Sequence, residues 1–231
     1  MAVLVPARDE ERALPAVLDA LPRDGPTWSV LEVVVVDNGS RDATADVARA
    51  HGATVVPEPR RGYGAACLAG LAHLRLSPPE VVAFLDADGS DDPAELPRLL
   101  APLLEARAEL VVGSRRLGVS EPGALTPVQA FGNHLASALL RASWGAEVTD
   151  LGPFRAVRWD ALERLGMRDR DYGWTVEMQA RALRAGLRVV EVPVSSRRRR
   201  AGRSKVSGTL RGTAGAALKI LGTIVRVRLG G

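Results

Sequence analysis

The chain has 231 residues, 46% of them hydrophobic and 25% charged, enough for one globular domain with a substantial core. Its single cysteine, Cys67, excludes an internal disulfide framework and favours a reducing compartment such as the cytoplasm. The net charge of +4 is unevenly placed, because residues 197–231 hold ten Lys and Arg and no acidic residue, leaving 21 basic and 27 acidic residues before them. The sequence therefore predicts a mildly acidic domain with a basic tail. The tail lacks the interleaved aromatic residues that nucleic-acid binding by stacking uses, so we expect no nucleic-acid partner.

The first half of the chain alternates short apolar runs with amphipathic segments. Polar residues or glycines follow each run, which marks the end of a strand and a turn. Such alternation predicts an α/β fold with a mostly parallel central sheet and helices on both faces. The expected strands are 2–6, 31–36, 54–56, 81–85 and 109–112, and the expected helices lie around 14–21, 44–50, 65–76 and 93–106.

The second half shows the same elements less clearly. We expect a turn at 150–155, helices at 160–165 and from about 172 to 185, a last strand at 187–194, and a helix at 126–141 with Phe131, Leu135, Leu139 and Leu140 on its apolar face. A weaker helical pattern over 208–229 has basic residues opposite its apolar ones and lacks the ~20 continuous apolar residues of a membrane span. The pattern predicts a basic amphipathic helix lying on a membrane surface, with a terminal helix docked on the domain or a disordered end as the alternatives.

Four aspartates follow the apolar run at 81–85. Asp86 and Asp88 come directly after it, at the carboxyl end of a predicted central strand, where open α/β sheets bind ligands. Like charges so close together are costly unless a cation compensates them, and Mg²⁺ or Mn²⁺ shared with substrate phosphates would do so. Asp91 and Asp92 precede Pro93 and suit helix capping. We therefore predict a cation site followed by a capped helix.

Chemically distinctive residues also follow the other predicted strands. They are Pro6–Glu10, Asp37, 60–64 and Arg115. The glycine loop at 62–64 is weak on its own, because it has neither dinucleotide-binding nor phosphate-loop spacing. Together, however, carboxylates, arginines and exposed backbone amides at one sheet edge suit a nucleoside diphosphate with its metal.

Seven or more short motifs in order resemble a known family. Val5-Pro6-Ala-Arg-Asp-Glu10, Asp37-Asn-Gly-Ser40 and Asp86-Ala-Asp88 are similar to family 2 glycosyltransferases of the GT-A fold. The second half resembles the dolichol-phosphate (polyprenyl-phosphate) mannose synthase branch through Gly113-Ser-Arg115, Gly152-Pro-Phe-Arg155, Gly173-Trp-Thr-Val-Glu-Met178, Glu191-Val-Pro193 and Arg199-x-x-Gly202-x-Ser204-Lys205. The resemblance covers about residues 3–206, so we expect a GT-A domain over 1–206 and a basic amphipathic tail over 207–231.

The resemblance also implies roles for individual residues. For nucleotide binding it implies Pro6, Ala7, Arg8, Glu10, Asp37, Arg61, Gly62 and Asp86, with Asp37 accepting hydrogen bonds from the base. For the metal it implies Asp86, Asp88 and Ser90, and for phosphate binding Arg115, Arg199 and Lys205. The candidate catalytic residues are Asp88, Arg115, Arg155 and Glu177.

The implied reaction is a metal-dependent, inverting transfer of a hexose from GDP-mannose or a UDP-sugar to polyprenyl or dolichyl phosphate. A saccharide or small-molecule hydroxyl is the alternative acceptor, and would require a carboxylate such as Glu177 or Asp150 to take its proton. A sugar-phosphate nucleotidyltransferase is disfavoured because the segment after the first strand is acidic and lacks glycine. A non-catalytic subunit is a further alternative. With a lipid acceptor, the tail would place the protein at the cytoplasmic inner face of a membrane.

Overall fold

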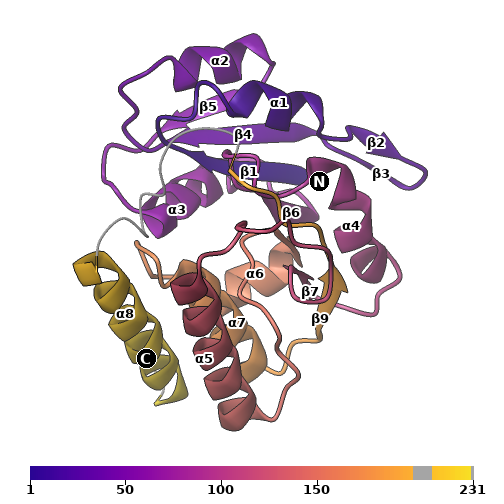
Figure 1. The fold of residues 1–231 in the computed structure, drawn as a ribbon. Helices are drawn as coiled ribbons and strands as arrows, with labels where there is room; N and C mark the ends of the chain where they lie inside the picture. Colours follow the sequence, from indigo (N-terminus) through magenta and orange to yellow (C-terminus); the bar gives the residue numbers. More distant parts are fainter. Residues whose placement is uncertain (200–209, 230–231) are drawn as a thin grey trace.

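The computed structural model describes residues 1–199 and 210–229 (Figure 1). Its largest sheet has seven strands in the order β5-β4-β1-β6-β8-β7-β9. All of them run in the same direction except β8, which is antiparallel to both of its neighbours. The predicted mostly parallel sheet is confirmed. The strands are β1 (Ala2–Ala7), β4 (Glu32–Asp37), β5 (Thr54–Pro57), β6 (Val81–Phe84), β7 (Leu110–Ser114), β8 (Arg155–Arg158) and β9 (Val189–Pro193).

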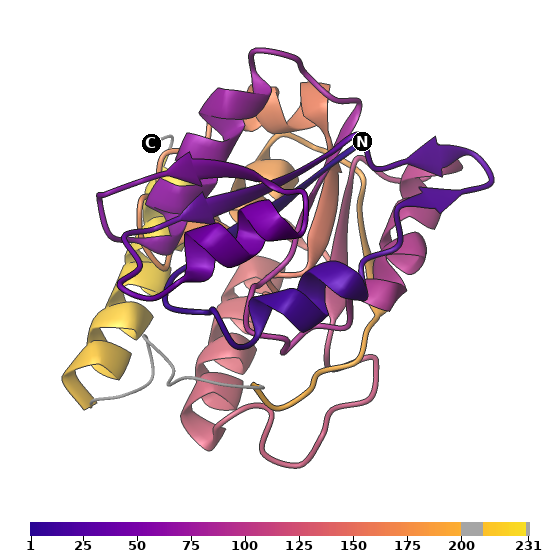
Figure 2. The same ribbon diagram turned by 90° about the horizontal axis from the view of Figure 1, so that it is seen from above.

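Helices cover both faces of this sheet, as the alternating pattern predicted (Figures 1 and 2). Successive residues of β1 serve opposite faces, since Val3 and Val5 belong to one apolar cluster and Leu4 to the other. Burial on both faces explains why the central strands are nearly continuous apolar runs. One face carries α1 (Leu14–Asp19), α2 (Thr44–Ala50) and α4 (Leu96–Leu104), and the other carries α3 (Tyr63–Leu74), α6 (Trp159–Leu165) and α7 (Trp174–Arg184).

A further helical layer lies outside α7. It consists of α5 (Pro127–Trp144) and α8 (Leu210–Arg228), which lie side by side in Figure 1. Apolar residues from all three helices form one cluster, which includes Leu140, Val176 and Ile224. The C-terminal half of α8 is therefore docked on the domain, while its contact with a membrane stays a prediction. Among the described helices, none is both long and apolar enough to cross a bilayer.

Three local features differ from the sequence prediction. Strand β8 was not predicted, because Arg155 was assigned to a turn and 156–158 to no element. It has an arginine at each end and pairs with a strand on either side. A short hairpin, β2 (Asp24–Gly25) with β3 (Trp28–Ser29), lies between α1 and β4, where no strand was predicted. Phe131 does not belong to a buried face of α5, because its side chain is 67% exposed and the helix packs through Ala136, Ser137 and Leu140 instead.

The strand directions decide where the chemistry gathers. Because six of the seven strands run the same way, their carboxyl ends share one edge, and β8 begins at that edge. Asp37, Asp86, Arg115 and Arg155 follow or begin strands there. The expected concentration of charged residues at one sheet edge is thus a consequence of topology.

Candidate functional site

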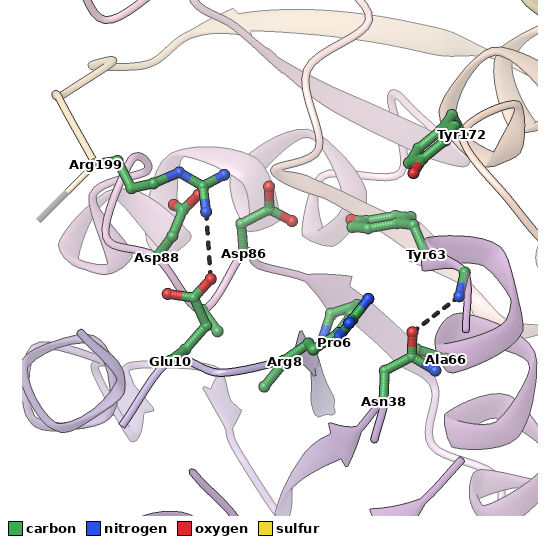
Figure 3. Close-up of a pocket in the computed structure, with 13 residues that line it drawn as sticks. Pro6, Arg8, Glu10, Asn38, Tyr63, Ala66, Asp86, Asp88, Tyr172 and Arg199 are labelled. Atoms are coloured by element: carbon green, nitrogen blue, oxygen red, sulfur yellow. Dashed lines mark hydrogen bonds and ion pairs between the residues drawn. The ribbon is translucent and has the colours of Figure 1, made fainter. Parts of the chain in front are cut away.

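A cavity of about 180 Å³ opens at the carboxyl ends of β1, β4 and β6 (Figure 3). Eight of the residues predicted for the site line it, namely Pro6, Ala7, Arg8, Glu10, Gly62, Asp86, Asp88 and Arg199. Five other lining residues had no predicted role, namely Asn38, Tyr63, Ala66, Ala87 and Tyr172. The chain therefore brings together segments from its start, middle and end around one pocket.

Asp86 and Asp88 form the acidic part of the pocket. Burial and, secondly, the charge of Asp88 raise the pKa of Asp86 to about 7, against the smaller opposing effects of the Tyr63 hydroxyl and the arginines Arg199 and Arg115. Asp86 Oδ1 is buried and has no hydrogen-bond partner among the described residues. Asp88 Oδ1 instead accepts a 2.8 Å hydrogen bond from the Ser90 amide, which orients the carboxylate. Asp88 Oδ1 is thus held by a hydrogen bond, whereas Asp86 Oδ1 is left without one among the described residues.

Arg199 crosses the pocket between two carboxylates. Its Nη2 lies 2.6 Å from Asp88 Oδ2, and its Nη1 lies 3.2 Å from Glu10 Oε1 (Figure 3). The segment that follows β9 carries Arg199 to the site, and the amide of Arg197 in that segment donates to the Ser90 carbonyl at 2.8 Å. Because a guanidinium presents several donors in one plane, Arg199 is suited to bind phosphate oxygens as well as carboxylates.

The loop before α3 forms another wall of the pocket, and Asn38 holds it. The Asn38 side chain donates to the carbonyls of Glu58 (3.0 Å) and Arg60 (2.7 Å) and accepts from the Gly62 amide (2.9 Å). Gly62 has φ +141°, and a Cβ there would lie 2.1 Å from the Arg170 carbonyl oxygen, so glycine is required. The Asn-Gly turn signal was visible in the sequence, but nothing in it indicated that Asn38 reaches this loop.

Three residues predicted to bind the nucleotide or the metal lie just outside the lining. Asp37 accepts a 2.9 Å hydrogen bond from the Ser40 amide within its own turn. Arg61 is exposed beside Gly62, and Ser90 meets Asp88 through its backbone amide. Asp37 and Arg61 are next in sequence to lining residues, and Ser90 is hydrogen-bonded to one. Contacts of these three residues with a ligand stay predictions.

Arg115 is held in an ion pair at the same edge of the sheet. Its Nε and Nη2 lie 2.8 Å and 2.7 Å from the two carboxylate oxygens of Asp150, and its amide donates to the same group. Burial would raise the pKa of Asp150, but the hydrogen bonds and charge of Arg115 outweigh it and lower that pKa. The positive charge of Arg115 also acts on Asp86. Asp150 is therefore a buried partner of Arg115, a poor arrangement for a general base.

Arg155 lies in the core of the protein and not in the pocket lining. Its side chain is fully buried and donates to the backbone carbonyls of Leu151, Gly152 and Thr175. Burial lowers the pKa of Arg155 to about 10, which still leaves it charged at neutral pH. Within the described chain its guanidinium is committed to backbone oxygens, and this placement favours a structural role over the predicted catalytic one.

Glu177 is likewise buried away from the pocket lining. Its carboxylate pairs with Arg181 at 2.8 Å and accepts hydrogen bonds from the amides of Arg168 and Asp169. These contacts fix the connection between α6 and α7. The geometry favours the positioning role that the motif also allowed, and the direct catalytic role stays a prediction.

The last two aspartates of the acidic stretch divide their roles. Asp92 accepts from the Ala94 amide at 3.2 Å and caps the helical turn at Pro93–Glu95, as predicted, and it also pairs with Arg197. Asp91 is not a cap, which corrects the prediction. It is buried and bridged through its backbone to Ser196, and burial and the charge of Asp86 raise its pKa well above the usual range. Lys205 lies outside the described residues.

The residues present fit a divalent cation that is shared with a substrate. The raised pKa of Asp86 and its unsatisfied buried oxygen show negative charge that the protein compensates incompletely. Among the described residues, no group of three or more His, Cys, Asp and Glu side chains converges as a complete metal site. Mg²⁺ commonly uses one or two carboxylates together with substrate phosphates and water, so Asp86 and Asp88 could hold such an ion with a diphosphate.

The mostly parallel sheet, with an acidic pair and an arginine at its carboxyl edge, has the GT-A fold. The structure of glucosyl-3-phosphoglycerate synthase from Mycobacterium tuberculosis, in complex with Mn²⁺, UDP-glucose and phosphoglyceric acid, shares this fold. It aligns with a TM-score of 0.76 at 24% identity and covers 98% of this chain and 79% of that chain.

The sequence relationships identify the family. The model for glycosyl transferase family 2 matches residues 2–166, and the chain belongs to that family. An uncharacterized glycosyltransferase of Mycobacterium tuberculosis is 45% identical over 91% of each chain. The undecaprenyl-phosphate mannosyltransferase of Micrococcus luteus is 33% identical over 91% of this chain and 89% of its own. The polyprenol monophosphomannose synthase of Mycolicibacterium smegmatis is 31% identical over 90% and 81%. The predicted resemblance to the polyprenyl-phosphate mannose synthase branch is confirmed.

Proposed function

We propose that this glycosyltransferase moves a hexose from a nucleoside diphosphate sugar to a polyprenyl phosphate, with inversion at the anomeric carbon and with Mg²⁺ or Mn²⁺. The observation that carries the proposal is the pocket in which the acidic pair Asp86 and Asp88 faces Arg199. The relatives named undecaprenyl-phosphate mannosyltransferase and polyprenol monophosphomannose synthase support the lipid-phosphate acceptor. They also favour mannose as the sugar, with GDP-mannose or a UDP-sugar as the donor.

Each group in the pocket has a task in this reaction. Asp86 and Asp88 would hold the cation together with the donor diphosphate, and such a cation supplies positive charge that stabilises a leaving group. Arg199 turns from the carboxylates of Asp88 and Glu10 toward phosphate oxygens, which adds a second positive charge where negative charge develops. Arg8 and the loop held by Asn38 bind the nucleotide beside them.

The proposed lipid-phosphate acceptor is supported by the contacts of the two carboxylates that were candidates for a general base. Asp150 is tied to Arg115, and Glu177 to Arg181 and two amides. A hydroxyl acceptor would need a carboxylate able to take its proton, whereas a phosphate monoester is already an anionic nucleophile. The commitment of these two carboxylates therefore favours a lipid phosphate over a saccharide hydroxyl.

The test is binding followed by transfer. Thermal unfolding is measured with GDP, UDP, GDP-mannose and UDP-glucose, each with Mn²⁺ and with chelator, because a specific ligand raises the unfolding temperature by mass action. The stabilising nucleotide sugar is then supplied with undecaprenyl phosphate or with a soluble saccharide, and the glycolipid is assayed. We expect metal-dependent binding and transfer to the lipid phosphate. Transfer that ignores added polyprenyl phosphate would refute the acceptor, and stabilisation by none of the nucleotides would refute the donor.

A further inference from the structure

The connection 166–173, between α6 and α7, supports the nucleotide side of the pocket. Tyr172 in this connection lines the cavity directly. The amides of Gly64 and Ala65, in the first turn of α3, donate to the carbonyls of Asp171 (3.2 Å) and Arg170 (2.8 Å). A Cβ at Gly64 would lie 2.1 Å from the Asp169 carbonyl oxygen. The start of α3, which carries Gly62 and Tyr63 into the pocket, therefore packs directly against this connection.

Asp169 organises the connection from within. Its Oδ1 accepts hydrogen bonds from the amides of Asp171 (2.7 Å) and Gly173 (3.2 Å). Its side chain is only 2% exposed, so an unpaired charge there would be costly. The geometry of the pocket wall thus depends on a buried carboxylate and on whatever balances its charge.

The C-terminal helix supplies that balance. Lys219 Nζ of α8 lies 3.3 Å from Asp169 Oδ2 and 3.3 Å from Asp171 Oδ2. Burial would lower the pKa of Lys219, but the two carboxylates more than offset this and raise it. The helix also approaches closely at Thr223, because a Cβ at Gly173 would lie 2.9 Å from Thr223 Oγ1. One turn of α8, from Lys219 to Thr223, therefore packs against the C-terminal half of the connection.

We propose that Lys219 is a positioning residue for the nucleotide pocket, and that α8 completes the pocket wall through it. Lys219 neutralises Asp169 and Asp171, the connection 166–173 keeps its shape, and the first turn of α3 and Tyr172 are held where the donor binds. The inference rests on the proposed donor binding and adds a residue that lies outside the pocket lining. It gives the C-terminal helix a role in substrate affinity in addition to any contact with a membrane.

The first test measures the wall itself and needs no ligand. Hydrogen exchange of the Gly64 and Ala65 amides is followed in the whole chain and in Lys219→Met, with Lys219→Arg as the charge-preserving variant. We expect Lys219→Met to accelerate exchange of these two amides roughly 5-fold or more, while amides in the middle of α3 stay protected. Lys219→Arg should restore protection. Unchanged exchange at both amides would overturn the proposal, whatever the protein binds.

The second test measures the consequence for binding. The dissociation constant is determined by calorimetry for GDP and UDP with Mn²⁺, and the donor KM and kcat are determined for the stabilising nucleotide sugar. Lys219→Met should weaken binding and raise KM roughly 5-fold or more with kcat nearly unchanged, and Lys219→Arg should reverse the loss. Arg226→Met is the matched control, since Arg226 is an exposed basic residue on the same helix with no ion pair in the described chain.

The outcomes separate the two proposals. If the wild-type protein binds neither nucleotide, the proposed donor fails, and the exchange measurement alone decides the role of Lys219. If the wild type binds and Lys219→Met binds equally well, or if Arg226→Met weakens binding as much, the positioning role is refuted. A lower unfolding temperature with unchanged affinity would also refute it, because a merely structural ion pair behaves in that way.

Discussion

The two halves of the chain use charged residues in opposite ways. In the parallel half, from β1 to β6, charged side chains that follow strands point into the pocket, as Arg8, Glu10, Asp86 and Asp88 do. In the half around the antiparallel strand β8, Arg115, Arg155 and Glu177 are instead paired within the protein. Arg199, which follows β9, is the exception in this half because it lines the pocket. Both halves carry equally clear motifs. A charged motif residue can therefore serve a ligand or the fold, and its partners decide which.

The largest expected effect comes from changing a charged residue of the pocket that we propose to bind the ligand. Asp88→Asn removes a charge from the proposed cation site but keeps the shape of the side chain, so we expect transfer activity to fall by about 100-fold or more. The free energy of unfolding should change little, because repulsion from Asp86 is relieved while the Arg199 contact weakens. Asp46→Asn, at an exposed position on α2, is the control. Full activity of Asp88→Asn would remove the cation from the mechanism.

Arg155→Met tests whether a buried charged residue of the second half stabilises the fold. The substitution fills similar volume but leaves buried carbonyls of Leu151, Gly152 and Thr175 without their donor. Each unsatisfied group costs energy, so we expect the free energy of unfolding to fall by about 3 kcal/mol, as measured by urea denaturation. Nucleotide affinity of the folded fraction should persist. Normal stability with lost activity would return Arg155 to the catalytic residues.

Glu177→Gln distinguishes a positioning carboxylate from a catalytic one. The amide keeps the size of the side chain but loses the ion pair with Arg181, which we expect to cost about 1–3 kcal/mol of unfolding free energy. The value of kcat should stay within about twofold of wild type, because Glu177 lies outside the pocket lining and is paired with Arg181. A large fall in kcat at unchanged stability would contradict this assignment.

The smallest expected effect is the pH dependence of the Arg115–Asp150 pair. The folded-state pKa of Asp150 is below its ordinary value of 3.8, so ionised Asp150 stabilises the fold above that value. This contribution is lost as the pH falls from about 4 through the folded-state pKa, where the carboxylate takes up a proton. Asp150→Asn should therefore flatten the acid side of the stability curve as the pH falls below about 4. An unchanged acid slope would show that other carboxylates carry it.

The fold was largely predictable from the sequence, because strands buried on both faces are continuous apolar runs, as Val33–Val36 shows. Strand β8 escaped prediction because Arg155 at its start is buried, and one of the carbonyls to which it donates, that of Thr175, is 20 positions away in the sequence. Exposed Phe131 on α5 also breaks the expected pattern. Tertiary contacts determine whether such side chains are buried, and the local hydrophobic periodicity of the sequence does not show these contacts.

The site was predictable where a residue follows a parallel strand, since topology alone brings those positions together. Eight predicted residues line the pocket for this reason or because of the family motifs. Tyr172 was missed because it reaches the pocket from a connection between two helices, and Asn38 because its hydrogen bonds span 20 residues or more. Arg155 and Glu177 were predicted as catalytic because a sequence motif shows that a charged residue is present. It does not show which groups of the folded protein that residue contacts.

The contact between Glu10 and Arg199 has a consequence for biosynthesis. The two residues are 189 positions apart, and each helps to enclose the same cavity. While the chain emerges from the ribosome, the β1–β6 segment can collapse early, but its acidic edge lacks this arginine until β9 and the segment after it have been made. A nascent or C-terminally shortened chain would thus expose uncompensated carboxylates, so donor binding should be gained only when synthesis has passed residue 199.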